Sequence, residues 1–219
     1  MFLVHGRKKT LGIINGPISK ETLLKGKFNG ITEFISSKMK SAGSEVMLLY
    51  NKNFSISPIT THIPINKVSK KINTRKIISN TKNIVHFYKK YFNKKIKVGI
   101  TGLNPHSYSS LKNSEENKII IPAIKKLKEN KINISGPLST DSLFLKKNYK
   151  KYDVIIGMYH DQVLTPFKTI FGQNGINITL GLPFLRLSPD HGVAKDIIGR
   201  KIANPTSLIQ CIKFFRNLK

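Results

Sequence analysis

Apolar runs of strand length alternate along this chain with segments of helical periodicity, and no other feature limits the fold as strongly. Several strand-like runs are apolar without alternation, as expected when both faces of a sheet are covered. The predicted strands are residues 11–16, 45–50, 57–62, 97–103, 132–135, 154–160 and 176–182. The predicted helices are residues 32–42, 69–92, 115–129 and 206–218. This order predicts an α/β fold with a mostly parallel sheet, helices on both faces, and ligands bound beyond the carboxyl ends of the strands.

The length and the cysteine content narrow the class of protein further. With 219 residues, of which 39% are hydrophobic, the chain can bury a sizeable core. We therefore expect residues 1–219 to form one α/β/α catalytic region that could divide into two lobes. A single cysteine, Cys211, excludes an internal disulfide and favours a reducing, cytoplasmic compartment. No apolar stretch approaches the ~18 residues of a membrane helix, so no membrane partner is expected.

The strongly basic charge raises the question of a nucleic-acid partner. Lys and Arg number 38 against 11 Asp and Glu, a formal net charge of +27. Nucleic-acid interfaces favour the bidentate fork of arginine, yet most of these basic residues are lysines, spread along the chain together with Asn and Ile. Lys, Asn and Ile have A+T-rich codons, so a drift in base composition explains the charge. A basic nucleic-acid-binding protein is the less favoured alternative.

Three histidines follow apolar runs of the predicted sheet. His62 ends SPITTH, His106 follows KVGITGLNP, and His160 ends VIIGMYH. Each histidine taken singly is well explained as a packed or hydrogen-bonded side chain. In a parallel sheet, however, the three would meet at one edge, and three nitrogen ligands with an open position describe a catalytic divalent-metal site. Nitrogen donors favour zinc or a similar transition metal over calcium.

Polar residues after the third histidine indicate an anionic substrate. Asp161 follows His160 directly, and Lys168, Asn177 and Arg186 come later. A lysine, an amide and an arginine near a metal suit phosphate or carboxylate, which arginine holds through paired hydrogen bonds. For Lys168 alone, simple surface solvation is an equally natural explanation. We expect Lys168, Asn177 and Arg186 to line one pocket next to the metal.

Several motifs occur together in the order and spacing of one enzyme family. They are NGPISKETL (15–23), TTHIPI (60–65), GLNPH (102–106), MYHDQ (158–162), NITLGLPF (177–184) and DHGVA (190–194). Together they closely resemble the 4-hydroxythreonine-4-phosphate dehydrogenases of pyridoxal phosphate (vitamin B6) biosynthesis. The resemblance extends from about Leu11 to the carboxyl end, so it covers nearly the whole chain.

The resemblance implies an enzyme that uses NAD and a divalent metal. It would oxidise the C3 alcohol of 4-phosphohydroxy-L-threonine, and the β-keto acid would then lose its carboxylate to give 3-amino-2-oxopropyl phosphate. The resemblance places zinc, or alternatively magnesium or cobalt, on the three histidines, and it implies substrate contacts from Thr32, Lys168, Asn177 and Arg186. We expect Asp161 and Lys168 to be the catalytic residues. The family also implies a homodimer whose site takes residues from both subunits.

The stretch DHGVAKDIIGRKIANP (190–205) is similar to the cofactor loop of the isopropylmalate dehydrogenases, which share their fold with the isocitrate dehydrogenases and with this family. This similarity implies contacts to the adenosine half of NAD from His191, Gly192, Asp196 and Asn204. The sequence contains no GxGxxG motif, and that fold does not need one.

Two departures from the family pattern fall at the expected site. Ile31 stands where the family has a histidine that contacts substrate, and Ser107–Ser110 replaces a glycine-rich, acidic turn. The family also begins with about another third of chain, so we expect this chain to lack part of the amino-terminal lobe. The alternative within the same lineage is therefore a weakly active or inactive relative that keeps metal or phosphate binding.

Overall fold

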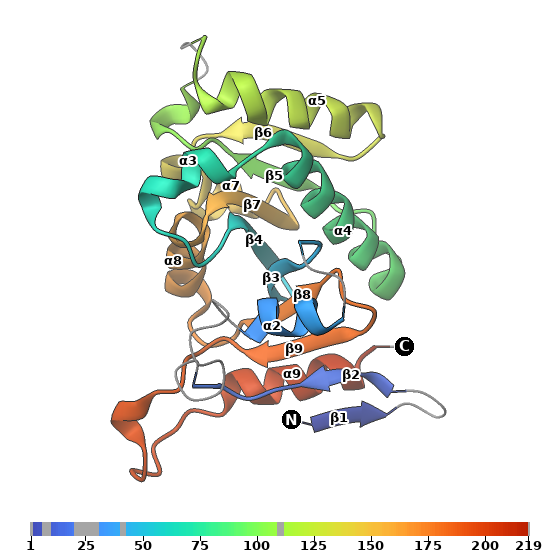
Figure 1. Ribbon diagram of the computed structural model, residues 1–219, viewed down its shortest axis with the longest axis vertical. Coiled ribbons are helices and arrows are strands. Elements are labelled where there is room, and N and C mark those ends of the chain that lie inside the picture. The colour runs from blue at the N-terminus through green and yellow to red at the C-terminus, as the bar shows by residue number, and fades with distance from the viewer. Residues whose placement is uncertain (1, 6–9, 20–30, 40–42, 109–111, 219) are drawn as a thin grey trace. The chain divides into compact units, whose positions relative to one another are not determined.

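The chain folds into two compact units, one made from the two ends of the chain and the other from the continuous stretch between them. The structure, a computed structural model, describes residues 2–5, 10–19, 31–39, 43–108 and 112–218 (Figure 1). Met1–Asn51 and Phe171–Lys219 form the terminal unit, and Lys52–Ile170 form the central unit. Within the described residues, no helix is both long and apolar enough to cross a membrane.

A parallel sheet organises the central unit. Its strand order is β4 (Phe54–Thr60), β7 (Val154–Tyr159), β5 (Val98–Thr101) and β6 (Ile134–Leu138), and each strand runs parallel to its neighbour. Strands β4, β5 and β7 are buried nearly throughout, whereas β6 at the edge of the sheet is buried only at Ile134. Burial of both faces explains the continuous apolar composition of β7. The centre of the core consists of side chains with no exposed surface: Ile56, Val98, Ile100, Val154, Ile155 and Ile156.

Helices cover the central sheet. They are α3 (Val68–Lys71), α4 (Thr74–Phe92), α5 (Ile121–Glu129), α6 (Thr140–Leu143), α7 (Lys146–Tyr149) and α8 (His160–Phe171). Helix α4 packs against α5 and β4, and α5 packs against β6. The helix predicted over 69–92 is divided, because Ile72 is extended and the side chain of Asn73 caps α4 by accepting a hydrogen bond from the backbone N–H of Lys76 at 2.9 Å.

The terminal unit contains a mixed sheet. Its order is β1 (Phe2–His5), β2 (Thr10–Ile14), β9 (Leu185–Pro189), β8 (Ile176–Leu180) and β3 (Val46–Asn51). Strands β2 and β9 are parallel, whereas β1–β2, β9–β8 and β8–β3 are antiparallel. Helix α9 (Thr206–Arg216) packs on β2, β8 and β9, and α2 (Ile31–Lys38) belongs to the same unit.

The predicted α/β class with a parallel sheet is confirmed. The sequence prediction missed two strands of the terminal unit, β1 and β9, and three helices of the central unit, α6, α7 and α8. The helix predicted over 32–42 runs over 31–38 as α2, while residues 40–42 lie outside the described residues. The helix predicted over 115–129 starts with a π-helical turn at Glu116–Ile120 and continues as α5.

Candidate functional site

The carboxyl edge of the central sheet carries the three histidines that the sequence singled out. His62 follows β4, His106 follows β5, and His160 follows β7 directly as the first residue of α8. Because β7 lies between β4 and β5 and all three run in the same direction, their carboxyl ends are neighbours at one edge. The backbone therefore brings the three segments together in the arrangement that a shared ligand would need.

His62 and His160 lie closest to each other within this group. Their ring centroids are 5.7 Å apart, and the ring planes are tilted by 42°. The Nδ1 atom of His160 lies 2.7 Å from Oδ1 of Asp161, and the side chain of His160 is 33% exposed. A carboxylate at Nδ1 favours the tautomer with its proton there, which leaves Nε2 as the ring's ligand atom. Asp161 is thus placed to orient His160.

His106 has its own acidic neighbour. It lies in the 3-10 turn Pro105–Ser107, and its Nδ1 is 3.4 Å from Oδ2 of Asp141. The pKa of Asp141 is held below its ordinary value, first by the hydroxyl of Ser139 and the backbone N–H of Ser142 and then by the charge of His106. The side chain of His106 is 79% exposed. It is therefore accessible to a ligand from solvent.

The donor set at this edge fits a divalent metal in type, since it consists of imidazoles with a carboxylate behind one of them. In the part of the chain that the structure describes, no three His, Cys, Asp or Glu side chains already stand together as a metal cluster. His62 and His160 form a pair, and His106 lies beside Asp141. The assignment of the three histidines as metal ligands stays a prediction.

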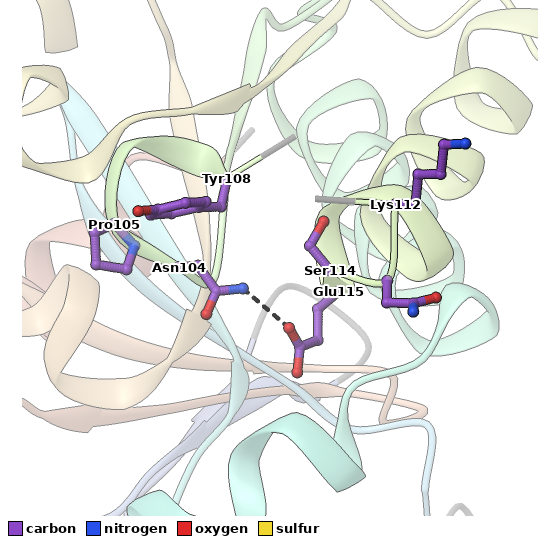
Figure 2. Close-up of a pocket in the computed structure, with 7 residues that line it drawn as sticks. Asn104, Pro105, Tyr108, Lys112, Ser114 and Glu115 are labelled. Carbon is purple, nitrogen blue, oxygen red and sulfur yellow. Dashed lines mark hydrogen bonds between the residues drawn. The ribbon is translucent and has the colours of Figure 1, made fainter. Parts of the chain in front are cut away.

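A cavity of about 560 Å³ opens beside the turn that carries His106 (Figure 2). The residues that line it all belong to the segment after β5: Asn104, Pro105, Tyr108, Lys112, Asn113, Ser114 and Glu115. Ser107 and Tyr108 belong to the departure noted in the sequence, whereas Ser109 and Ser110 lie outside the described residues. The aromatic ring of Tyr108 thus lines this cavity together with the charged residues Lys112 and Glu115.

Arg186 is the most buried basic side chain of the predicted site. It lies on β9, and only 1% of its surface is exposed. Its Nε donates to Oδ1 of Asn15 at 2.6 Å, and its Nη1 donates to the hydroxyls of Thr32 at 3.0 Å and Thr179 at 2.9 Å. The terminal unit therefore joins two of the predicted substrate residues, Arg186 and Thr32, by a direct hydrogen bond.

The other two predicted substrate residues differ in setting. Asn177 lies on β8 of the terminal unit, and its side-chain oxygen is buried without a hydrogen-bond partner among the described residues. A buried acceptor without a donor lowers the stability of the fold, unless a bound ligand donates a hydrogen bond to it. Lys168 lies exposed on α8 of the central unit. That Lys168, Asn177 and Arg186 line one pocket next to a metal stays a prediction.

The predicted cofactor loop is an exposed segment of the terminal unit before α9. Nδ1 of His191 lies 3.0 Å from the carbonyl oxygen of Gly192, and Asp196 lies in a 3-10 turn, Lys195–Ile197. The side-chain oxygen of Asn204 accepts the backbone N–H of Thr206 at 2.9 Å. The structure therefore shows a loop in which these four residues are exposed, and their role in NAD binding stays a prediction.

Sequence reasoning missed two buried side chains that support this edge, Gln162 and Glu116. Gln162 is the last residue of MYHDQ, and its position two residues after His160 in that motif was the sequence signal that could have found it. Glu116 is the second of a pair of glutamates and has no exposed surface. Nothing in its sequence context distinguishes it from a solvated acid.

Comparison with known proteins agrees with the motifs. The family model described as "Pyridoxal phosphate biosynthetic protein PdxA" matches residues 5–215. A 4-hydroxythreonine-4-phosphate dehydrogenase from Sulfurihydrogenibium sp. (strain YO3AOP1) is 41% identical over 216 residues, which cover 97% of this chain and 66% of that protein. The chain thus spans just under two thirds of this relative's length.

Solved structures agree with the sequence relatives. The crystal structure of 4-hydroxythreonine-4-phosphate dehydrogenase from Klebsiella pneumoniae superposes with a TM-score of 0.78 and 30% identity, covering 91% of this chain and 62% of that one. An isocitrate dehydrogenase from Methylococcus capsulatus, at 13% identity and a TM-score of 0.54, shares the fold alone; the match covers 90% of this chain and 65% of that one. Since the family model matches nearly all of its residues, the chain belongs to the family of the pyridoxal phosphate biosynthetic protein PdxA.

Proposed function

We propose that this chain takes part in the NAD-dependent oxidation and decarboxylation of 4-phosphohydroxy-L-threonine to 3-amino-2-oxopropyl phosphate. Its relatives are named 4-hydroxythreonine-4-phosphate dehydrogenases, which supports the choice of substrate and the dehydrogenase step. One observation carries the proposal: three histidines follow the neighbouring parallel strands β4, β7 and β5 at a single edge. Family membership and the buried arginine of β9 support it.

His62, His106 and His160 would hold a divalent metal, with zinc as the first expectation and magnesium or cobalt as alternatives. A bound metal supplies Lewis-acid chemistry, which lowers the pKa of a coordinated hydroxyl and polarises the carbonyl formed from it. Asp161 keeps the proton of His160 on Nδ1, because its carboxylate lies 2.7 Å from that atom. This role of Asp161 orients the ligand and does not require contact with substrate.

The residues of the terminal unit would bind the anionic substrate. Arg186 offers a charge held rigidly by Asn15, Thr32 and Thr179, and such a fixed guanidinium binds phosphate or carboxylate without losing side-chain freedom. Asn177 supplies a buried oxygen that accepts no hydrogen bond from the described residues. Lys168 belongs instead to the central unit, where it is exposed, and it would act as a general acid or as an anion contact.

NAD would bind along the loop that contains His191, Gly192, Asp196 and Asn204. The side chains of this loop are exposed, and its backbone includes a left-handed residue at Ala194 (φ +49°). In the proposed enzyme two copies of the chain form a homodimer with a shared active site, and the enzyme works in the cytoplasm on a small phosphorylated amino acid.

The test is NADH formation from 4-phosphohydroxy-L-threonine, measured with the full chain at saturating NAD and Zn²⁺. Replacing His62 or His160 by Ala should abolish the rate and lower bound zinc, because three ligands become two. Replacing the exposed His86 of α4 by Ala is the matched control, since it removes an imidazole from the same unit. Equal rates in wild type and His160→Ala would refute the metal-dependent mechanism.

A second candidate is a weakly active relative that keeps metal or phosphate binding. The observation that favours it is Ile31, which begins α2 next to Thr32, the hydroxyl that contacts Arg186. An apolar side chain there cannot replace an imidazole hydrogen bond to a polar substrate, a loss of roughly ten- to a hundredfold in rate. An Ile31→His variant should recover this factor. If it does not, Ile31 is not the reason for slow turnover.

A further inference from the structure

Two consecutive residues after β5 have a left-handed backbone conformation, which is unfavourable for any residue other than glycine. His106 and Ser107 follow each other with positive φ angles of 54° and 56°. Residues with a Cβ rarely adopt the left-handed region, and two in succession persist only when the surroundings hold them there. The contacts that hold this segment therefore also decide where the imidazole of His106 stands.

Glu116 binds the backbone of this segment from one side. Its Oε1 accepts the backbone N–H groups of Leu103 and Asn104, each at 2.8 Å. Its Oε2 accepts the side-chain amide of Asn104 at 2.9 Å, and the same amide donates to Glu115 at 2.9 Å (Figure 2). Glu116 has no exposed surface, so these donors compensate the burial of its charge.

Gln162 binds the same segment from the side of β7. Its Nε2 donates to the carbonyl oxygen of Gly102 at 2.8 Å, and its Oε1 accepts the hydroxyl of Thr101 at 3.0 Å and the backbone N–H of Met158 at 2.7 Å. The side chain is buried, with 8% of its surface exposed. One amide thus links the carboxyl ends of β5 and β7, the strands that precede His106 and His160.

We propose that Glu116 and Gln162 form a polar clamp that positions His106 relative to His160 and thereby sets the affinity of the edge for a divalent metal. The proposal rests on the proposed function, because it takes the histidines as metal ligands. Both residues act through the backbone of 101–104 and not through contact with the ligand. They are therefore positioning residues.

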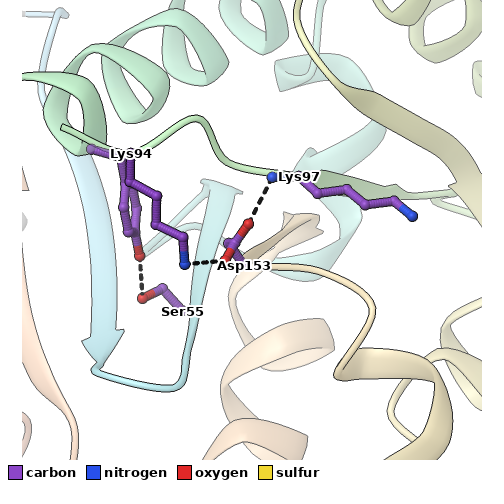
Figure 3. A network of polar contacts seen from close by, with 5 residues as sticks. Ser55, Lys94, Lys97 and Asp153 are labelled. Carbon is purple, nitrogen blue, oxygen red and sulfur yellow. Dashed lines mark hydrogen bonds and ion pairs between the residues drawn. The ribbon is translucent and has the colours of Figure 1, made fainter. Parts of the chain in front are cut away.

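The test compares the clamp with equivalent contacts at the opposite edge of the same sheet. There the carboxylate of Asp153 accepts the backbone N–H of Lys97 at 2.8 Å and the ammonium of Lys94 at 2.5 Å, and the hydroxyl of Tyr88 donates to Ser55 at 2.8 Å (Figure 3). Asp153→Asn matches Glu116→Gln, and Tyr88→Phe matches Gln162→Met. In each pair both variants remove side-chain hydrogen bonds at the end of a strand of this sheet, but only the clamp variant removes bonds to the segment before His106.

Zn²⁺ alone is titrated calorimetrically into the full chain and each variant, and the unfolding temperature is measured in parallel. We expect Glu116→Gln and Gln162→Met to weaken Zn²⁺ binding by about 10- to 100-fold, as loss of supporting contacts does at metal sites. Asp153→Asn and Tyr88→Phe should lower the unfolding temperature without changing the affinity. In a His106→Ala background, the clamp variants should have no further effect on affinity.

Two results would overturn the clamp and leave the metal site standing. One is an equal loss of affinity in the clamp and control variants, and the other is a clamp effect that persists without His106. If the wild-type chain binds no Zn²⁺, both the clamp and the metal site of the proposed function are refuted. The three results are distinguishable in a single set of titrations.

Discussion

Replacing Arg186 by Lys keeps the positive charge on β9 but removes the planar guanidinium, which donates hydrogen bonds to other residues of the terminal unit. The guanidinium donates hydrogen bonds to the side chains of Asn15, Thr32 and Thr179 at 2.6 to 3.0 Å. An ammonium group is a compact donor on a flexible stem and cannot reach three partners that surround a planar fork. We expect it to keep one of the three bonds.

The size of the effect follows from the two lost bonds and from burial. A hydrogen bond to a charged group contributes about 1.5–3 kcal/mol, and a buried acceptor left without a donor costs a similar amount. Asn15 and Thr179 are 6% and 1% exposed, so water cannot readily replace the lost donor. Taking the lower value for each bond, Arg186→Lys should reduce the free energy of unfolding by about 3 kcal/mol.

Urea unfolding of the full chain, followed by far-ultraviolet circular dichroism, measures this difference. Arg216→Lys is the matched control, because Arg216 is exposed on α9 of the same unit and its replacement should change stability by less than about 0.5 kcal/mol. If both variants unfold at the same urea concentration, the network around Arg186 contributes nothing to stability. The preorganised anion site proposed for Arg186 would then lose its structural basis.

Three further predictions concern single buried groups. Burial raises the pKa of the Cys211 thiol to about 12. Iodoacetamide at pH 8 should therefore label Cys211 very slowly in the native chain and fully in the urea-unfolded chain. Rapid labelling of the native chain would contradict the burial of Cys211. Burial raises the pKa of Glu116, but donors from Asn104 and Leu103 outweigh it and the net pKa is lowered. Its charge therefore stabilises the fold above the ordinary glutamate pKa of about 4.3, and the stability difference between wild type and Glu116→Gln should shrink as the pH falls through the lowered value. A Cβ on Gly157 would lie 2.4 Å from Cγ1 of Val163, so Gly157→Ala should destabilise by about 1–3 kcal/mol in thermal unfolding, and an unchanged midpoint would contradict the tight start of α8.

The strands of the central sheet were predictable because both of their faces are buried. The predicted apolar runs 57–62, 97–103 and 154–160 overlap the observed strands β4, β5 and β7. Helix α8 was missed because HDQVLTPFKTIF contains a proline and begins directly at the end of β7. The apolar positions Val163, Leu164 and Phe167 follow helical spacing, but Pro166 argues against a helix in the sequence alone.

Strand β9 was missed for a different reason. Arg186 interrupts the run LRLSP, and a fully buried arginine is rare enough to make the segment look like a loop. Its partners Asn15 and Thr32 lie 171 and 154 positions earlier, and Thr179 lies on the neighbouring strand β8. The sequence around Arg186 therefore does not show that its charge has hydrogen-bond partners. The same holds for Glu116, whose donors lie twelve and thirteen positions earlier.

The strand order shows why the candidate site could be predicted only in outline. The sequence places His62, His106 and His160 after three strands, but it does not say which strands are neighbours. If the four central strands were paired in chain order, β7 would lie three strands from β4, and at about 4.8 Å per strand His160 would follow a strand roughly 14 Å from the one before His62. In the structure β7 is instead inserted between β4 and β5, and the rings of His62 and His160 are 5.7 Å apart. The approach of His62 and His160 therefore depends on a long-range crossover. Gln162 can bond to the ends of both β5 and β7 only because these two strands are neighbours.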